Sequence, residues 1–182
     1  SFPPAMRKLM TQVLKDILGN VDKDEIDEKI LKFKKLMKTA DIQDIALPTG
    51  VKKLSKFADK RKVGKLYGKN GIFTPMHKGT PVHVKAAWIY NDLLKYHGLT
   101  NHEKIKSSEK IKWIYLKSNP LNVQQIAFKG YDDPPKIMEF IEQNIDYEKL
   151  FNRALLKKIR MFYEALDWDM PVDKINTLER FF

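Results

Sequence analysis

The sequence predicts an α+β fold that is predominantly α-helical, with a small antiparallel β element. Two long segments, residues 4–18 and 146–168, place apolar side chains at helical spacing. Between them, residues 110–117 alternate in the way that is typical of a strand. The composition, 43% hydrophobic and 31% charged, is that of a folded globular protein, and no apolar run is long enough to cross a bilayer.

The first two helices are predicted as a pair. Pro3 and Pro4 open the first helix, and Gly19 ends it. Its apolar stripe consists of Met6, Leu9, Met10, Val13, Leu14, Ile17 and Leu18. Asp22 and Glu25 resemble a capping box for a second helix. The buried face of that helix is expected to contain Ile26, Ile30, Phe33 and Met37. We expect this pair to pack at the base of the domain.

The most basic part of the chain follows a predicted turn at residues 48–50. Val51, Leu54 and Phe57 are spaced to form one face of a short helix, with lysines pointing away from it. Between positions 52 and 69 only Asp59 is acidic. The cations of this run are Lys52, Lys53, Lys56, Lys60, Arg61, Lys62, Lys65 and Lys69. A charge run is ordinarily a solvated surface, but this density of one sign favours contact with nucleic acid.

A central helix is predicted directly after this run. Thr80 is a candidate N-cap, Pro81 suits the first turn, and Gly98 is expected to close the helix. The residues at helical spacing are Val82, Ala86, Ile89, Leu93 and Leu94. His83 and Lys85 would lie in the first turns, where helix N–H groups attract anions. Taken alone, the position of His83 favours a residue that caps the helix or fills a half-buried gap over one that contacts phosphate.

The β element is predicted from two short segments. In residues 110–117, Ile111, Trp113 and Tyr115 share one face of the strand. The other face carries Lys112, Ile114 and Leu116. A turn at residues 119–120 would lead to a second strand at residues 125–128. A connector at residues 130–135 then precedes a short helix that contains Ile137, Phe140 and Ile141.

The last long helix is expected to begin after Asp146. Its predicted apolar face consists of Leu150, Phe151, Ala154, Leu155, Phe162 and Ala165. The opposing face carries Lys149, Arg153, Lys157 and Arg160. Such a stripe can be an exposed surface that only adds solubility. It can also bind phosphate, because four aligned cations repel one another unless an anion neutralises them. From residue 169 the periodicity is lost and a flexible tail is predicted.

The charge balance indicates a polyanionic partner. Lys and Arg number 34 against 23 Asp and Glu, a net charge of +11. The chain contains no cysteine, which excludes disulfides and thiolate metal sites and fits a reducing, cytoplasmic compartment. Its first residue is Ser1 and not Met, which is what a fragment or a processed product would show.

No catalytic constellation is found in the sequence. Phosphoryl transfer on two metal ions requires carboxylates at a strand end and in a tight turn, and no segment resembles that pattern. The four histidines lack the His-Glu-x-x-His spacing of a zinc site. We therefore expect no cofactor and no metal in this chain.

Several segments, in order and in spacing, resemble the thumb region of family B DNA polymerases, most of all those of T-even-like phages. The central one is Pro81-Val82-His83-Val84-Lys85-Ala86-Ala87, followed by Asn91. The other matching segments are residues 51–57 (VKKLSKF), 116–120 (LKSNP), 146–168 and 177–182 (TLERFF). The resemblance extends over nearly the whole chain.

This resemblance implies a role in DNA replication. Residues 1–40 would be the helical pair at the palm–thumb junction, residues 41–168 the DNA-binding thumb, and residues 169–182 a tail with a clamp-binding peptide. The chain would hold primer–template duplex through phosphates and sugars for a DNA-directed DNA polymerase, a nucleotidyltransferase. The catalytic aspartates and their magnesium would belong to the missing palm, so this chain alone would be inactive. Its partners would be duplex DNA, the rest of the polymerase (palm, fingers and exonuclease) and a sliding clamp, with no membrane, in the host cytoplasm if the source is a phage.

Residues and resemblance together give the predicted sites. The DNA-binding residues are Lys52, Lys53, Lys56, His83, Lys85, Lys117, Arg153 and Lys157. The resemblance implies that Leu178, Phe181 and Phe182 bind the clamp, whereas an alternative is that they pack on the chain's own core. Two other functions remain open: a self-standing basic protein that binds RNA or distorted DNA by stacking, and a nuclease or phosphotransferase with a cryptic metal site.

Overall fold

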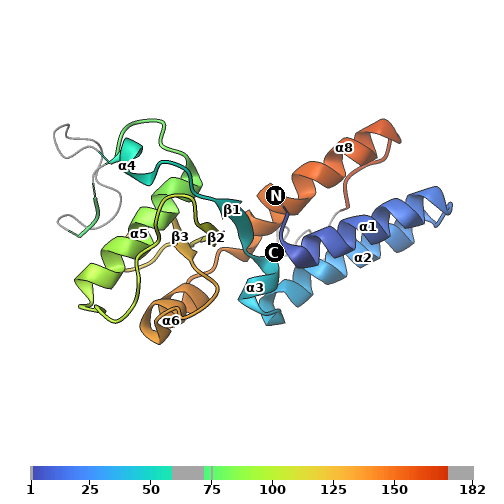
Figure 1. The fold of residues 1–182 in the computed structure, drawn as a ribbon. Helices are drawn as coiled ribbons and strands as arrows, with labels where there is room; N and C mark the ends of the chain where they lie inside the picture. Colours follow the sequence, from blue (N-terminus) through green and yellow to red (C-terminus); the bar gives the residue numbers. More distant parts are fainter. Residues whose placement is uncertain (1, 59–71, 75, 172–182) are drawn as a thin grey trace. The chain divides into compact units, whose positions relative to one another are not determined.

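The computed structural model describes residues 2–58, 72–74 and 76–171, which form two compact units (Figure 1). The sheet unit comprises Ala46–Asp146. The helical unit comprises Phe2–Ile45 and the described residues from Tyr147 to Pro171. The fold is α+β and mostly helical, with one small antiparallel sheet, as predicted. The last helix belongs to the same unit as the N-terminal helices. The domain boundaries expected from the sequence had placed this helix in the domain of residues 41–168.

Three long helical segments build the helical unit. They are α1 (Pro4–Leu18), α2 (Lys23–Leu36) and a C-terminal helix that consists of α7 (Tyr147–Leu150), a π-helical stretch (Phe151–Leu156) and α8 (Lys157–Ala165). A 3-10 turn (Met37–Thr39) and the short α3 (Ile42–Ile45) follow α2. The largest side chains of this core with almost no solvent exposure are Met6, Ile26, Ile30, Met37, Ile45, Phe151 and Tyr163.

The predicted stripe of α1 is only partly buried. Met6, Met10 and Val13 are in the core, but Leu18 is 83% exposed. The helix instead buries Asp16, whose carboxylate accepts hydrogen bonds from Lys29 (2.7 Å) and Gln12 (2.8 Å). The bond from Lys29 holds the pKa of Asp16 below its usual value, with a smaller contribution from Gln12. A buried carboxylate at this position is compatible with the fold because both of its oxygens are paired.

The C-terminal helix buries a different face from the predicted one after Leu155. Ile159 and Tyr163 are fully buried, whereas Phe162 is 38% exposed and Ala165 is exposed. The π-helical stretch just before them has a wider turn than an α-helix, so a strict 3.6-residue period does not carry through it. Tyr163 donates a hydrogen bond to Asp27 (2.6 Å), and its ring meets Trp168 edge to face at 5.3 Å.

The sheet unit contains a three-stranded antiparallel sheet in the order β1-β2-β3. The strands are β1 (Leu47–Gly50), β2 (Lys110–Tyr115) and β3 (Gln125–Phe128), and Trp113 of the central strand pairs with Leu47 and Ala127. The predicted strands at 110–117 and 125–128 are thus confirmed. The turn predicted at Pro48–Gly50 is wrong, because these residues extend along β2. Pro48 is tolerated there because β1 is an edge strand of the sheet.

Helix α5 (Val82–Tyr96) packs against β3 and β2, and it carries the core of this unit. Its most deeply buried residues are Val84, Ala86, Ala87, Ile89, Tyr90 and Leu93. Gly98, with φ of +64°, closes the helix as predicted. The predicted cap is wrong: Thr80 is buried and donates to the carbonyl of His77 (2.6 Å), while Pro81 occupies the N-cap position.

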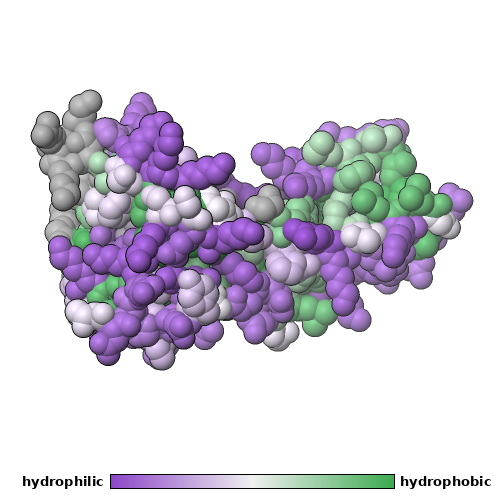
Figure 2. Space-filling model, viewed as in Figure 1, coloured by the Kyte–Doolittle hydropathy of each residue, from purple (hydrophilic) through white to green (hydrophobic). Residues whose placement is uncertain are grey.

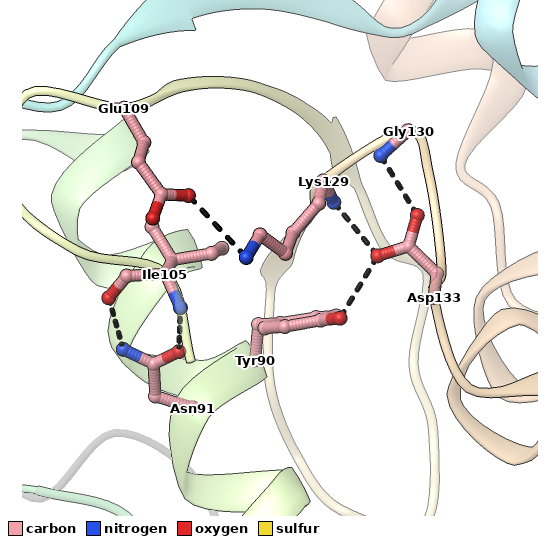
Figure 3. A network of polar contacts seen from close by, with 7 residues as sticks. All are labelled: Tyr90, Asn91, Ile105, Glu109, Lys129, Gly130 and Asp133. Carbon is pink, nitrogen blue, oxygen red and sulfur yellow. Dashed lines mark hydrogen bonds and ion pairs between the residues drawn. The ribbon is translucent and has the colours of Figure 1, made fainter. Parts of the chain in front are cut away.

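Two shorter helices, α4 (Leu54–Phe57) and α6 (Pro135–Gln143), complete the sheet unit. The connector between β3 and α6 is tied to α5 by Asp133 (Figure 3). Its carboxylate accepts hydrogen bonds from Tyr90 Oη (2.9 Å) and from the backbone N–H groups of Lys129 (2.8 Å) and Gly130 (2.7 Å). Burial is the main cause that raises the pKa of the Tyr90 phenol far above its usual value, and the hydrogen bond to Asp133 adds to it. The phenol therefore remains a donor.

Candidate nucleic-acid interface

The positive charge of the chain is concentrated in the sheet unit. Residues 46–146 contain 18 Lys and Arg against 9 Asp and Glu, whereas the rest of the chain contains 16 against 14. Nine of the eleven net charges therefore belong to one unit. Hydrophilic residues cover most of the face of this unit that is seen in Figure 2. A surplus of this size on a unit of about one hundred residues favours an anionic partner for that unit.

The segment 51–57 presents its lysines to solvent because its apolar residues are fixed. Val51 and Leu54 are buried, while Lys52, Lys53 and Lys56 are exposed. The Val51 N–H donates to the Glu109 carbonyl (3.0 Å), and the Leu54 N–H donates to Ser107 Oγ (2.9 Å). The predicted separation of an apolar face from a lysine face is thus present, and three lysines project from an anchored backbone.

Helix α4 is also fastened to α5. The indole Nε1 of Trp88 donates to the carbonyl of Leu54 at 3.0 Å, so that the short α4 rests on the first half of α5. Lys53 precedes α4 in the left-handed conformation, with φ of +52°. This contact brings the element that carries Lys56 against the helix that carries His83 and Lys85.

Two further lysines, which were not predicted, belong to this surface. Lys110 pairs with Gly50 at the start of β2, directly before the anchored Val51. Lys106 adjoins Ser107, whose hydroxyl accepts the Leu54 N–H. Both are exposed. They are more than fifty positions from Lys52 in sequence, so only the strand pairing of residues 47–50, which was not predicted, brings them close. We call Lys52, Lys53, Lys56, Lys106 and Lys110 the lysine cluster.

The predicted residues at the start of α5 are less exposed than expected. His83 and Lys85 are both half-buried, and the neighbouring residues Val84 and Ala86 are buried. Loss of solvent lowers the pKa of His83 below its usual value of 6.5. The imidazole is therefore mainly neutral at pH 7. It would meet a phosphate as an N–H donor and not as a cation, so the charge at this end of α5 comes from Lys85.

This lowered pKa predicts a pH dependence of stability. Between the pKa of folded His83 and about 6.5, the unfolded chain binds more protons than the folded chain, so stability rises with pH across this window and is lost as the pH falls through it. We expect urea unfolding to show a lower stability at pH 5.5 than at pH 7.5, and a smaller difference in His83→Gln. The His83 ring should titrate in NMR spectra with a midpoint below 6.5; a midpoint at or above 6.5 would contradict the burial.

Lys117 lies apart from the lysine cluster. It is exposed and follows β2, and its N–H donates to the Asn144 carbonyl (2.9 Å). Lys110 is at the other end of the same strand. At about 3.3 Å per residue, seven residues separate Lys117 from Lys110 by roughly 23 Å. The structure therefore separates Lys117 from the predicted lysines of segment 51–57, and these residues do not form one patch.

Arg153 and Lys157 belong to the helical unit. Both are exposed, Arg153 within the π-helical stretch and Lys157 at the start of α8. Arg160 is also exposed, and Lys149 is half-buried. The predicted basic face of the C-terminal helix is thus solvent-accessible over most of its length.

Some predicted features lie outside the described residues. These are the cations Lys60, Arg61, Lys62, Lys65 and Lys69 and the tail residues Leu178, Phe181 and Phe182. Within residues 2–58, 72–74 and 76–171, no three His, Asp or Glu side chains gather closely enough to hold a metal ion. In the same part of the chain, no helix has the length and apolar character needed to cross a bilayer.

No family model matches this sequence, and no curated protein is significantly similar to it.

Proposed function

We propose that this chain is a thumb-like, non-catalytic part of a family B DNA polymerase that holds primer–template duplex through its phosphates. One observation supports this proposal above the others: a surplus of nine positive charges in the sheet unit, with the lysine cluster projecting from an anchored backbone. The sequence resemblance supplies the family.

The chemistry of the surface suits backbone contact. Lysine ammonium groups on long stems act as point charges toward phosphates, and phosphate contacts carry no direct sequence information. A replicative enzyme must hold every sequence, so this kind of contact is what such a role requires. Lys85 would add a charge at the start of α5, and Lys117 a second contact region along β2. Arg153 and Lys157 would provide a further surface on the helical unit.

The remaining parts of the proposal concern partners outside the chain. Magnesium would be held by the palm carboxylates of the parent polymerase. Leu178, Phe181 and Phe182 would bind the sliding clamp through a single apolar face, because one helical turn gathers these positions.

A second candidate function is binding of single-stranded RNA or distorted DNA by a self-standing protein. Trp113 and Tyr115 favour it, since their half-buried rings meet edge to face at 4.8 Å on β2 and could stack on unpaired bases.

A competition experiment separates the two functions. The full chain is bound to a fluorescent duplex of about 20 bp at about 0.1 M salt and challenged with unlabelled duplexes of unrelated sequence or with single-stranded RNA of equal phosphate content. We expect all duplexes to compete equally and RNA to compete more weakly. Stronger competition by RNA, lost in Trp113→Ala, would favour the second function. A chain that ends at residue 176 should bind duplex unchanged but fail to bind a cognate sliding clamp.

A further inference from the structure

The helical unit carries an apolar groove beside α1. The groove has a volume of about 220 Å³ and is lined by Phe2, Arg7, Met10, Thr11 and Leu14. Arg7, Thr11, Leu14 and Leu18 fall at i, i+4, i+7 and i+11, so they form one stripe along α1, next to the buried stripe of Met6, Met10 and Val13. Leu18, one turn beyond Leu14 on the same stripe, is 83% exposed.

Helix α8 extends the same apolar surface. The ammonium of Lys158 lies 4.1 Å from the centre of the Phe2 ring, which connects α8 to the groove. Met161 and Phe162, one turn further along α8, are exposed, as is Leu166 after the helix. Figure 2 shows hydrophobic residues gathered over the part of the helical unit where α1 and α8 lie. Four of the seven large apolar residues that are exposed in the described part of the chain belong to these two helices or their ends.

The charge around the groove has one dominant sign. Arg7 lines it, Lys158 covers Phe2, and Lys8 and Lys15 are exposed on the adjoining face of α1. The one acidic residue of α1, Asp16, is buried and paired with Lys29 at 2.7 Å. The acidic residues on the side of α8 are Glu164 in the helix and the exposed Asp167 and Asp169 after it. Exposed apolar surface with a polar rim is typical of a protein-binding site, and this rim is complementary to an acidic partner.

We propose that this groove binds an amphipathic helix with acidic flanks that belongs to another polypeptide. A helix presents apolar anchors at i, i+3, i+4 and i+7, which fits a surface that combines this groove with the stripe along α1. The 15 residues of α1 provide about 22 Å of length, or four turns of a partner helix. The surface is concave at Phe2 and Leu14, which suits a helix better than the flat surface of a bilayer. This proposal involves other residues than the DNA-binding proposal and does not depend on it.

The probe is a fluorescent peptide of about 18 residues with Leu at i, i+3, i+4 and i+7 of each repeat and Glu on the flanks. Binding to the full chain is measured by anisotropy, next to a scrambled peptide of the same composition and a peptide with Lys in place of Glu. We expect the acidic amphipathic peptide to bind at least tenfold more tightly than either control, and added salt to weaken it.

Substitutions on the apolar surface test where the peptide binds. Leu18→Gln and Met161→Gln change exposed side chains, so the fold should be kept, and each should weaken peptide binding about tenfold. Leu36→Gln is the matched control, because Leu36 is 53% exposed at the end of α2, outside the groove. Duplex DNA binding should be unchanged in all three variants, which separates this proposal from the DNA-binding one.

Four results would overturn the proposal. The first is equal binding of the scrambled peptide, and the second is unchanged binding in both Leu18→Gln and Met161→Gln. The third is peptide binding that occurs only after residues 172–182 are deleted, which would assign the groove to the chain's own tail. The fourth is binding to anionic vesicles that Leu18→Gln and Met161→Gln abolish while no peptide binds, which would assign the surface to a membrane.

Discussion

Replacing Asp133 by Asn is expected to destabilise the sheet unit by about 3 kcal/mol. The carboxylate accepts three hydrogen bonds, from Tyr90 Oη and from the N–H groups of Lys129 and Gly130. An amide has one acceptor oxygen and turns an NH₂ group toward one of these donors. Tyr90 is fully buried, so its hydroxyl has no water to bond instead. Urea unfolding measures the loss.

Asp132→Asn is the matched control for this prediction. Asp132 is the adjacent, exposed residue, and its φ of +51° is one that Asn tolerates. We expect a change within about 0.5 kcal/mol. A second control places Tyr90→Phe in the Asp133→Asn background, where it should cost less than in the wild type because a neutral amide oxygen is a weaker acceptor for the Tyr90 hydroxyl than the carboxylate. Equal destabilisation by the Asp132 and Asp133 substitutions would show that this network does not hold the connector.

The largest effect on binding is expected from the triple variant Lys52→Gln, Lys53→Asn, Lys56→Gln. Each lysine–phosphate contact raises the logarithm of the association constant by about 0.9 at 0.1 M salt relative to 1 M. The loss of three contacts should therefore weaken duplex binding by roughly 100-fold or more. Asn is chosen at position 53 because its φ is +52°. All three side chains are exposed, and stability should change by less than about 1 kcal/mol. Anisotropy with a labelled duplex measures the affinity.

The control for the triple variant removes the same number of charges from the helical unit. Lys32, Lys35 and Lys38 are exposed on α2 and the 3-10 turn that follows it. Changing all three to Gln should leave most of the affinity, because they lie outside the proposed contact surface. If both triple variants lost affinity equally, the binding would reflect net charge alone, and the lysine cluster would have no special role.

Local patterns in the sequence predicted most of the fold. The alternation at residues 110–117 indicated β2, because a half-buried strand has a period of two. The turn at residues 119–120 indicated the returning strand β3 at 125–128. β1 was not predicted because proline in a short segment suggests a turn. Proline is tolerated in an edge strand, but the sequence does not show which strand lies at the edge of the sheet. The burial of Tyr163 in place of Phe162 depends on the π-helical stretch before it, which a regular helical period does not predict.

The candidate site could be predicted only in part, because some of its residues come together only through tertiary structure. The lysines of segment 51–57 were found because they alternate with buried residues. Lys106 and Lys110 were missed because their proximity to that segment depends on the pairing of β1 with β2. The lowered pKa of His83 comes from burial among side chains of the folded unit, and its position at a helix start does not reveal it. The spacing of charges along the chain therefore indicated that segment 51–57 forms a basic surface. Which other lysines lie beside this segment depends on the pairing of β1 with β2.

The central claim is that the chain binds duplex DNA through several phosphate contacts and without base readout. The most direct test is the dependence of the association constant on salt, measured with the full chain and two duplexes of unrelated sequence. If about five phosphates are neutralised, log K should fall against log salt with a slope of about −4 to −5, identical for both duplexes. A flat salt response, or slopes and affinities that differ between the two sequences, would contradict the claim.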